Sequence, residues 1–485
     1  MSVDLPELAN LRPGLPVGPG WRTDVATAPV IFPYDGSTVA HAPVGTVEHA
    51  RAALDAGVAA RRPVAALSSA ARRAILLDVA RELEAHSEAF VDLLIAETGK
   101  TRIDCTVELS RTLFTWSAAA EEVAHLHGET VPLDLQASGA GLVGFWTRKP
   151  IGLVIGVAGF NYPLLLATHK IAPAIAAGCP VICKPAPATP LATLWLADIV
   201  RRAAAEHGAP AEIVQVVTGD AEVGRALVTD PRIGVVSFTG SAAVGHQIAR
   251  DAAPRKTLLE LGSNAALVVD ADADLDAAAD AVLRGGFYGN GQACISVQRV
   301  LVCEPVLDEF VGRLTARIGE LTVGDPRLPD TRVAALINDA STRRVLDWIE
   351  AAETAGAKRL CGGSVRDRAI EPTVLLDVPE TADAWCEEIF APVVAVRSVP
   401  DLDAALDSVN RSRYGLHASV FTRSLAAAFR AIEELEVGGV IVNEVPGFRS
   451  DIMPYGGVKD SGVGREGPRF AIEELTVTRM AVIRP

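Results

Sequence analysis

Apolar residues near the start of the chain recur with the spacing of amphipathic helices. In residues 46–61 and 69–95 they return every three or four positions, with Arg and Glu between them. This pattern predicts two helices, and we expect Pro63 to separate them because proline cannot donate a helical hydrogen bond. From Gly128 to Val157 the pattern changes to short extended segments, which predict strands.

A regular alternation of strands and helices follows. Four short apolar runs are predicted strands: 181–184, 213–217, 235–238 and 257–260. Three amphipathic segments between them are predicted helices: 192–206, 222–228 and 242–252. Strands joined by helices of this length form parallel sheets that are covered on both faces.

A second alternation begins near residue 263 and predicts another unit of the same kind. Its strands are expected at 266–269 and 299–302, and its helices at 275–286 and 305–320. A domain boundary is therefore expected near residues 260–265, although no Pro- or Ser-rich linker marks it. The predicted fold class is α/β with two domains.

Composition and charge narrow the classes of function. The chain has 485 residues, of which 49% are hydrophobic and 22% charged, enough for large buried cores. Its formal net charge of −15 makes nucleic acid and anionic membrane surfaces poor partners. The seven cysteines are odd in number and scattered, which argues against a disulfide framework and for a reducing compartment. Because no Cys/His cluster has ligand spacing, no metal site is predicted.

Two segments bear on the location of the protein. Met1–Pro6 lacks the basic start and the apolar core of a secretory signal. Residues 151–168 carry no charge, but three glycines, Asn161 and Pro163 interrupt them. We interpret that stretch as a strand, a glycine-rich turn and a helix start, because a spanning helix needs about 20 uninterrupted residues. The expected location is the cytoplasm.

A cysteine in a glycine-rich segment is the first candidate for chemistry. Cys294 ends the string Phe-Tyr-Gly-Asn-Gly-Gln-Ala-Cys, where small residues would let a substrate and backbone amides reach its thiol. A nucleophilic cysteine also needs a group that favours its thiolate and a site for an oxyanion. The alternative is an inert core cysteine.

Two polar residues at predicted strand ends could serve that cysteine. Glu260 would lie at the carboxyl edge of the sheet, where burial would raise its pKa toward that of a general base. Asn161, in Gly-Phe-Asn-Tyr-Pro, could donate to an oxyanion together with the Cys294 amide. The alternatives are a solvated charge at Glu260 and a helix cap at Asn161.

Two further segments could bind a nucleotide. Lys184 begins Lys-Pro-Ala-Pro-Ala-Thr-Pro after a strand, and Gly240 and Ser241 precede the predicted helix that includes Gly245. Backbone amides at a helix start can hold a phosphate. Neither segment is a G-x-G-x-x-G motif or a P-loop, so neither alone identifies a nucleotide.

Taken together and in this order, the motifs resemble those of the aldehyde dehydrogenase superfamily. The same order continues with Glu387-Glu-Ile-Phe-Ala-Pro392 and Pro454-Tyr-Gly-Gly-Val-Lys459-Asp-Ser-Gly. The resemblance extends from about residue 25 to the end. It implies a Rossmann-type cofactor domain, an α/β catalytic domain and a bridging β-hairpin.

The resemblance also implies a mechanism. Cys294 would attack the aldehyde to form a thiohemiacetal, with Asn161 and the Cys294 amide holding the oxyanion. Loss of hydride to NAD or NADP would leave a thioester, and water activated by Glu260 would hydrolyse it. The residues assigned to cofactor binding are Lys184, Pro187, Gly240, Ser241, Gly245, Leu261, Glu388 and Phe390.

Two positions depart from the family pattern. Many NAD-preferring relatives carry glutamate where this chain has Pro187. Without that carboxylate the adenosine 2′-OH loses a hydrogen bond and a 2′-phosphate loses a repulsion, so both cofactors stay open. Ala391 replaces the usual glycine, a small change that we expect to be tolerated. Lys170 is also in its family position and could be only structural.

The substrate tunnel is inferred from the same resemblance. Its expected lining is Trp116, Tyr162, Leu165, Leu166, His169, Ala293, Ile295 and Phe448-Arg449-Ser450. We assign Arg111, Tyr162, Ile295 and Arg449 to substrate binding, since the strings around both arginines resemble lactaldehyde, glyceraldehyde and phosphonoacetaldehyde dehydrogenases. Two arginines could hold an acid group, which predicts a small polar or anionic aldehyde. In the alternative they form surface ion pairs, Arg111 with Glu108 or Glu121 and Arg449 with Asp451.

The implied organisation has three parts. Residues 1–127 and 148–260 would form the NAD(P)-binding domain, and 261–440 the catalytic domain. Residues 128–147 and 441–485 would be bridging and oligomerisation segments and include the substrate loop. The hairpin would join the C-terminal strand, about 474–485, in assembly, and its open edges favour a homodimer or homotetramer.

Other activities stay open at this stage. A CoA-acylating dehydrogenase would share the fold but would not need Glu260 as a base. A non-catalytic protein that keeps the fold and an enzyme that reduces an activated acid are the remaining alternatives.

Overall fold

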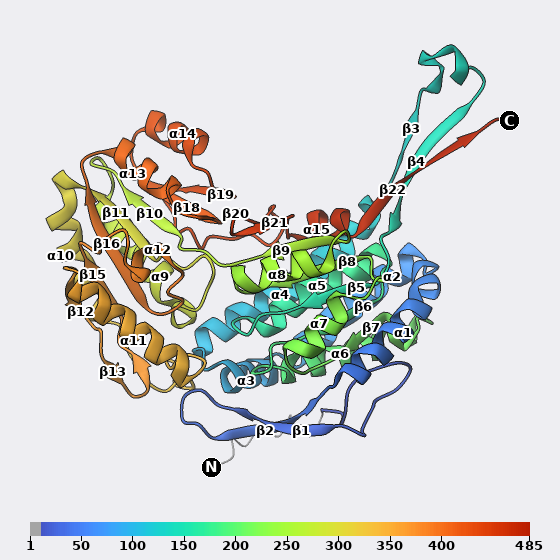
Figure 1. Cartoon of the computed structure of the whole chain (residues 1–485), viewed down its shortest axis with the longest axis horizontal. Helices are drawn as coiled ribbons and strands as arrows, with labels where there is room; N and C mark the ends of the chain where they lie inside the picture. Colours follow the sequence, from blue (N-terminus) through green and yellow to red (C-terminus); the bar gives the residue numbers. More distant parts are fainter. Residues whose placement is uncertain (1–10) are drawn as a thin grey trace.

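The first of two large sheets carries the predicted cofactor segments (Figure 1). The structure is a computed structural model that describes residues 11–485, so the prediction for Met1–Pro6 lies outside the described residues. The sheet has the order β21-β9-β8-β5-β6-β7, and it is parallel except for β21. Its strands are β5 Val154–Val157, β6 Val181–Lys184, β7 Val214–Val216, β8 Val235–Thr239, β9 Lys256–Glu260 and β21 Gly462–Val463.

Helices cover both faces of this sheet. They are α1 Val47–Ala65, α2 Ser69–Ala85, α3 Ser87–Thr98, α4 Arg102–Glu122, α5 Pro163–Ala177, α6 Leu191–Glu206, α7 Ala221–Val228 and α8 Ala242–Ala252. Helices α5 and α6 pack on the strands, and α2, α3 and α4 pack on them as an outer layer. The parallel strands all end at one edge, which is where Lys184 and Glu260 lie.

The second sheet has seven strands in the order β12-β15-β16-β11-β10-β18-β19, and only β12 is antiparallel. Its strands are β10 Ala266–Val269, β11 Arg299–Cys303, β12 Lys358–Cys361, β15 Thr373–Leu376, β16 Val393–Val399, β18 His417–Phe421 and β19 Gly439–Val442. Its helices are α9 Leu275–Phe287, α10 Leu307–Ile318, α11 Asp339–Thr354, α12 Asp383–Cys386, α13 Leu402–Asn410 and α14 Leu425–Glu434. Strands β10 and β11 are buried along their whole length, as near-continuous apolar runs predict.

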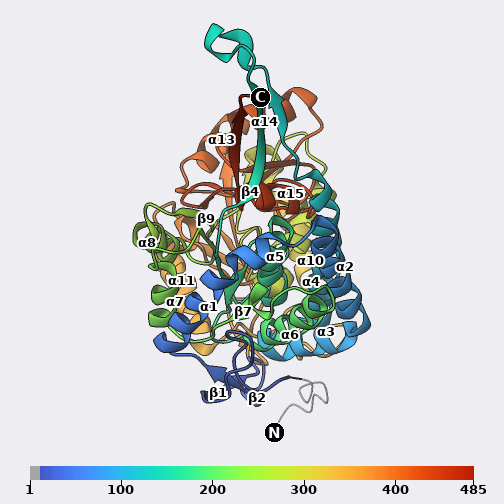
Figure 2. The ribbon, with the colours of Figure 1, turned by 90° about the vertical axis from the view of Figure 1, so that its right-hand side faces the viewer.

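A three-stranded arm projects from the body of the molecule (Figures 1 and 2). It consists of β3 Glu129–Val131, β4 Val143–Pro150 and β22 Thr476–Ile483, and β22 follows α15 Pro468–Glu474. The structure pairs β22 antiparallel with β4 of the same chain, so the predicted joining of hairpin and C-terminal strand needs no second copy. The other small elements are the hairpins β1 Ala26–Ile31 with β2 Thr38–Val44 and β13 Val365–Arg366 with β14 Ala369–Ile370, and the pair β17 Tyr414–Gly415 with β20 Val458–Lys459.

Some predictions for the first hundred residues are wrong. Pro63 does not end the first helix, because α1 continues to Ala65, and the next helix is divided in two at His86. Pro63 lies in the last turn of α1, where one missing hydrogen bond is outweighed by the packing of Val64, which is fully buried.

Helix α4 has no counterpart among the predictions. Its segment is rich in Thr and Ser, which are poor helix formers in isolation. In the structure Thr106, Thr112, Thr115 and Ser117 each donate a hydrogen bond to the carbonyl four residues earlier. The buried Trp116 holds the helix against α5 through a 3.1 Å hydrogen bond to Thr168.

The chain passes from the first sheet to the second between residues 260 and 266, since β9 belongs to the first sheet and β10 to the second. The limits of the three predicted parts stay predictions. Residues 151–168 form β5, a turn and the start of α5, as interpreted from the sequence. Within residues 11–485, no helix is both long enough and apolar enough to span a bilayer.

Candidate active site

The loop that carries Cys294 has a backbone that only certain residues can adopt. Gly289, Asn290 and Gly291 all have positive φ, of 56°, 59° and 71°. A Cβ on Gly291 would lie 2.1 Å from the carbonyl of Ala391, so glycine is required there. The conformation of Asn290 is held by three hydrogen bonds, to the carbonyls of Gly99 and Ala335 and from the amide of Ala334.

The thiol of Cys294 lies in a largely apolar pocket. It packs against a cluster formed by Ile295, Leu416 and Tyr455, and its sulfur is 3.0 Å from the hydroxyl oxygen of Tyr455. Burial raises the pKa of the Cys294 thiol to about 11, and the hydrogen bond with Tyr455 opposes that rise. Ile295, one of the residues assigned to the substrate, is therefore adjacent to the thiol.

Asn161 reaches the cysteine loop from the turn after β5. Its amide nitrogen donates a 2.8 Å hydrogen bond to the carbonyl of Gln292, two residues before Cys294. One N–H fixes the side chain, and the second N–H of the same amide can donate to an oxyanion. The side chain does not cap α5, whose N-cap residue is Tyr162.

Glu260 ends β9 and is buried, with 6% of its surface exposed. The alternative of a solvated strand-end charge is therefore wrong. Burial, followed by the negative charge of Glu466, raises the pKa of Glu260 well above its usual value. Its Oε2 atom has no hydrogen-bond partner within residues 11–485. It borders a cavity of about 10 Å³, about the room that one water molecule needs.

The residues assigned to the cofactor fit a nucleotide. Lys184 is only 6% exposed at the end of β6, its pKa is lowered by burial, and it has no ion pair within the described residues. Ser241 is exposed at the N-terminus of α8, so its amide can reach a phosphate. A Cβ on Gly245 would come within 2.2 Å of Leu261, which explains the glycine in that helix. Pro187 is exposed, and nothing in the structure tests its role.

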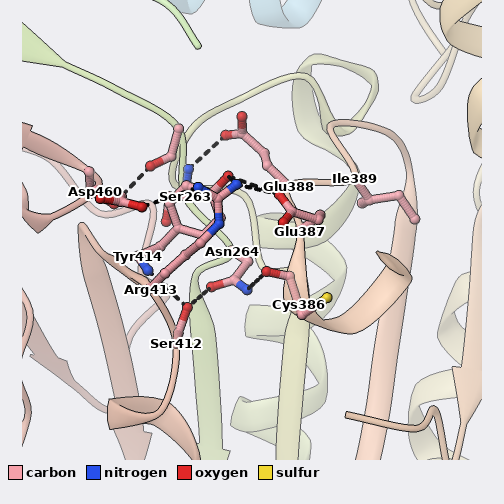
Figure 3. A network of polar contacts seen from close by, with 12 residues as sticks. Ser263, Asn264, Cys386, Glu387, Glu388, Ile389, Ser412, Arg413, Tyr414 and Asp460 are labelled. Carbon is pink, nitrogen blue, oxygen red and sulfur yellow. Dashed lines mark hydrogen bonds and ion pairs between the residues drawn. The ribbon is translucent and has the colours of Figure 1, made fainter. Parts of the chain in front are cut away.

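A hydrogen-bonded network holds the loop with Glu388 and Phe390 (Figure 3). The amide of Ser263 donates a 2.9 Å hydrogen bond to Glu388, and a Cβ on Gly262 would come within 2.7 Å of the same carboxylate. Burial raises the pKa of Glu388 to about 7. Phe390 has a φ of 52° and packs edge-on against Phe160, next to Asn161.

Polar side chains that sequence reasoning missed support this loop. Arg413 bridges Glu387 and Asp460, and Asn264 donates to the carbonyl of Cys386 at 3.3 Å (Figure 3). Gln298, four residues after Cys294, accepts from the amide of Ile389 and donates to the carbonyl of Glu387. Its place shortly after the candidate nucleophile was the only signal in the sequence.

The two candidate substrate arginines share one carboxylate. Arg111 forms a bidentate pair with Asp451 at 2.7 and 3.0 Å, and Arg449 lies 3.4 Å from Asp451 and 3.2 Å from Glu466. The alternative in which Arg111 pairs with Glu108 or Glu121 is wrong, because Arg111 pairs with Asp451. Glu108 instead binds Lys100 and the start of α5.

Arg449 is not a surface residue, although it does pair with Asp451 as the alternative supposed, whereas the Arg111 side chain is 25% exposed. The Arg449 side chain is 6% exposed, and its guanidinium lies 3.8 Å from the ring centre of Tyr455. Tyr162 is also buried, under the ammonium group of Lys100 at 3.6 Å. The roles of all these residues in substrate binding stay predictions.

A cysteine on a strained loop, a buried glutamate at a strand end and an amide donor are typical of a nucleotide-dependent enzyme with a thiol nucleophile. The chain belongs to the aldehyde dehydrogenase family, whose sequence model matches residues 21–481. It is an NAD(P)-dependent oxidoreductase that oxidises aldehydes.

Named relatives span almost the whole chain. It is 37% identical over 472 residues to 3-sulfolactaldehyde dehydrogenase of Priestia aryabhattai, covering 97% of this chain and 98% of the relative. The chain superposes on the crystal structure of aldehyde dehydrogenase 21 from Physcomitrella patens, in complex with the reaction product succinate, with a TM-score of 0.93. The two sequences are 37% identical, and the match covers 97% of this chain and 98% of the other. Glyceraldehyde-3-phosphate dehydrogenase GapN from Methanocaldococcus jannaschii, complexed with NADP, gives 0.91 at 34% identity, with coverages of 94% and 99%.

Proposed function

We propose that the chain oxidises a small aldehyde that carries a second, negatively charged group to the corresponding carboxylic acid. The observation that supports this substrate class is a largely buried cluster of Arg111, Arg449, His169, Lys170, Asp451 and Glu466, of which Arg111 is partly exposed. This cation cluster lies beside Tyr455, whose hydroxyl contacts the thiol of Cys294.

The cation cluster has an excess of positive charge. Arg111, Arg449 and Lys170 face two carboxylates, Asp451 and Glu466, whose pKa values are lowered by these cations. The neighbouring Glu260 is a third carboxyl group, and burial raises its pKa, which favours its neutral form. A buried surplus cation favours an anionic ligand.

Two members of the cation cluster also have buried nitrogen atoms without a well-aligned acceptor. Within residues 11–485, the Nε of Arg449 and both ring nitrogens of His169 form no hydrogen bond of good geometry, although Arg449 Nε lies 3.4 Å from Asp451 and His169 Nδ1 lies 3.1 Å from Glu466. Buried donors usually have a well-aligned acceptor. A carboxylate or sulfonate would supply acceptors for them. The names of two relatives point the same way, since sulfolactaldehyde carries a sulfonate and succinate has a second carboxylate.

The residues around the carbonyl would act in sequence. The Cys294 thiolate forms a bond to the carbonyl carbon, and the π electron pair of the C=O bond moves to the oxygen, where Asn161 and the Cys294 amide donate hydrogen bonds. Bound NAD or NADP supplies the hydride acceptor that makes the oxidation possible. Glu260 then takes a proton from water in the adjacent cavity, and the hydroxide displaces the acyl group from sulfur.

The cofactor would be held along the edge of the first sheet. We assign its adenosine ribose to Lys184, its pyrophosphate to Gly240, Ser241 and the start of α8, and its nicotinamide ribose to Glu388 and Phe390. Gly245 and Leu261 shape the wall behind that helix start. This arrangement leaves the thiol accessible to the aldehyde from the side of Arg449.

We also propose a homo-oligomer in the cytoplasm, with the domain limits given above. The outer strands of the arm, β3 and β22, leave edges that another copy can pair with or cover. Exposed apolar side chains, including Val143, Met480 and Ile483, lie on the same arm. The seven cysteines are all free thiols, which suits a reducing compartment.

Arg111→Met tests the substrate class. The variant loses one charge-assisted hydrogen-bonded pair with the anionic group of the substrate, an interaction worth about 1.5–3 kcal/mol. The KM for 3-sulfolactaldehyde or succinic semialdehyde is therefore expected to rise roughly 10- to 100-fold. The KM for neutral lactaldehyde should change less than about threefold, because Asp451 keeps Arg449 as a partner. Initial rates of cofactor reduction measure both constants, and the released product is identified by mass spectrometry.

Arg102→Met is the matched control, since Arg102 lies on the same helix but pairs with the peripheral Glu88 and Asp92. An equal loss with charged and neutral aldehydes would contradict an anion-binding role for Arg111. Release of product only in the presence of CoA would instead indicate a CoA-acylating enzyme.

Pro187→Glu tests the cofactor assignment. A carboxylate here would repel the 2′-phosphate of NADP and accept a hydrogen bond from the 2′-OH of NAD. The repulsion between the new carboxylate and the 2′-phosphate is worth about 1–2 kcal/mol. The ratio of kcat/KM for NADP to that for NAD is therefore expected to fall roughly tenfold. An unchanged ratio in parallel assays would remove Pro187 from the adenosine site.

A further inference from the structure

We propose that the hydroxyl of Tyr455 is a catalytic group that donates a hydrogen bond to the sulfur of Cys294 and stabilises its thiolate before the aldehyde binds. The proposal rests on the proposed function, in which Cys294 is the nucleophile. In this step the S–H bond breaks, its electron pair stays on sulfur and the proton goes to bulk water. The O–H bond of Tyr455 stays intact.

The first support is the position of the hydroxyl. Tyr455 is 2% exposed, and its oxygen lies 3.0 Å from the Cys294 sulfur. Within residues 11–485 this is its only hydrogen bond. A buried phenol needs a hydrogen-bond partner, and once the thiol has ionised only the phenol can be the donor.

The second support is the rigidity of Tyr455. Its amide donates to the carbonyl of Glu466 at 3.1 Å, and the amide of Glu466 donates back to the carbonyl of Tyr455. The ring packs edge-on against His417, with 5.1 Å between ring centres. Because the ring is fixed on both sides, the hydroxyl stays directed at the sulfur without further ordering when the thiolate forms.

The third support is the charge above the ring. The guanidinium of Arg449 lies 3.8 Å from the ring centre of Tyr455. A cation at this distance draws electron density from the phenol and makes its O–H a stronger donor. The same arginine belongs to the cation cluster, so the thiol and the proposed anion site are connected through one aromatic ring.

Other groups that face the thiol come from several segments. Glu260 at the end of β9 and Glu388 before β16 raise the pKa of Cys294, whereas Arg449 and the Tyr455 hydrogen bond lower it. Tyr288, after α9, is the remaining titratable neighbour, and it forms no hydrogen bond with the sulfur among the described contacts. Among the contacts of residues 11–485, Tyr455 is the neutral side chain that can donate directly to the sulfur.

Alkylation of the thiol tests the proposal without substrate or cofactor. The rate at which iodoacetamide, a neutral reagent, modifies Cys294 is measured by peptide mass spectrometry from pH 6 to pH 10. In Tyr455→Phe the rate–pH profile is expected to shift to higher pH by about one to two pH units, because the thiolate of Cys294 loses a hydrogen bond. At a fixed pH near neutrality this is roughly a 10- to 100-fold slower reaction.

Tyr288→Phe is the control, since it removes a second phenol hydroxyl near the thiol, from a partly buried side chain. Its profile should stay within about 0.3 pH unit of the parent's. A Tyr455→Phe profile that coincides with the parent's, or an equal shift in Tyr288→Phe, would overturn the proposal.

A second variant works in the opposite direction and keeps both ring and hydroxyl. Replacing Tyr455 by 3,5-difluorotyrosine gives a more acidic phenol and a stronger donor, so alkylation should be faster at the low end of the pH range, where the phenol keeps its proton. An unchanged or slower reaction would contradict the proposal. Because no aldehyde is present, these results are separate from the proposed function, which fails if Cys294→Ala still turns over.

Discussion

Cys294→Ala is expected to abolish aldehyde oxidation, with a fall in kcat/KM of at least about 10⁴-fold. The reason is that the covalent intermediate forms on this sulfur, and no bond to substrate can form once the thiol is removed. Reduced-nicotinamide absorbance measures the loss. Cofactor affinity should be retained, because the assigned ribose and phosphate contacts come from the edge of the first sheet and from the Glu388 loop.

Cys361→Ala is the matched control. Cys361 is a partly buried thiol on β12, at the outer edge of the second sheet. Its removal should leave kcat/KM within about twofold. Retained turnover in Cys294→Ala would refute the mechanism, whereas loss of cofactor binding would mean that the variant no longer folds correctly.

Glu260→Gln is expected to separate hydride release from acyl release. The amide keeps the shape of the buried side chain but cannot take a proton from water. A burst of about one equivalent of reduced cofactor should be followed by a steady state roughly 10²- to 10⁴-fold slower than in the parent. Stopped-flow absorbance resolves the two phases.

The pH dependence adds a second measurement for Glu260. Only the ionised carboxylate can act as the base, and burial raises its pKa well above the usual value. The parent's steady-state rate should therefore rise with pH through that raised pKa, and the rise should be absent in Glu260→Gln. A steady state that is unchanged by the substitution would remove Glu260 from thioester hydrolysis.

The sequence predicts several elements around the candidate site well because they are short strands and helices. A parallel sheet brings the carboxyl ends of its strands to one edge, and Glu260, expected at that edge, lies at the end of β9. The strands at 181–184 and 266–269 and the helix at 242–252 occur with the predicted limits. Each of them has a clear local pattern of apolar residues.

Contacts between distant segments could not be predicted in this way. Arg111 and Asp451 are separated by 340 positions, and Lys170 and Glu466 by 296. No periodicity encodes such pairs, because tertiary packing alone decides which side chains meet. Tyr455 lies in a string that contributes only to the family resemblance, and its contact with Cys294 spans 161 positions.

Mass spectrometry of the acid-quenched Glu260→Gln enzyme tests the central claim most directly. The variant is mixed with 3-sulfolactaldehyde and NAD or NADP, quenched during the burst and digested. We expect the peptide containing Cys294 to gain the mass of the 3-sulfolactyl group, and omission of the cofactor to prevent the thioester from forming. An adduct on another residue, or a burst of reduced cofactor without any acylated Cys294, would contradict the mechanism.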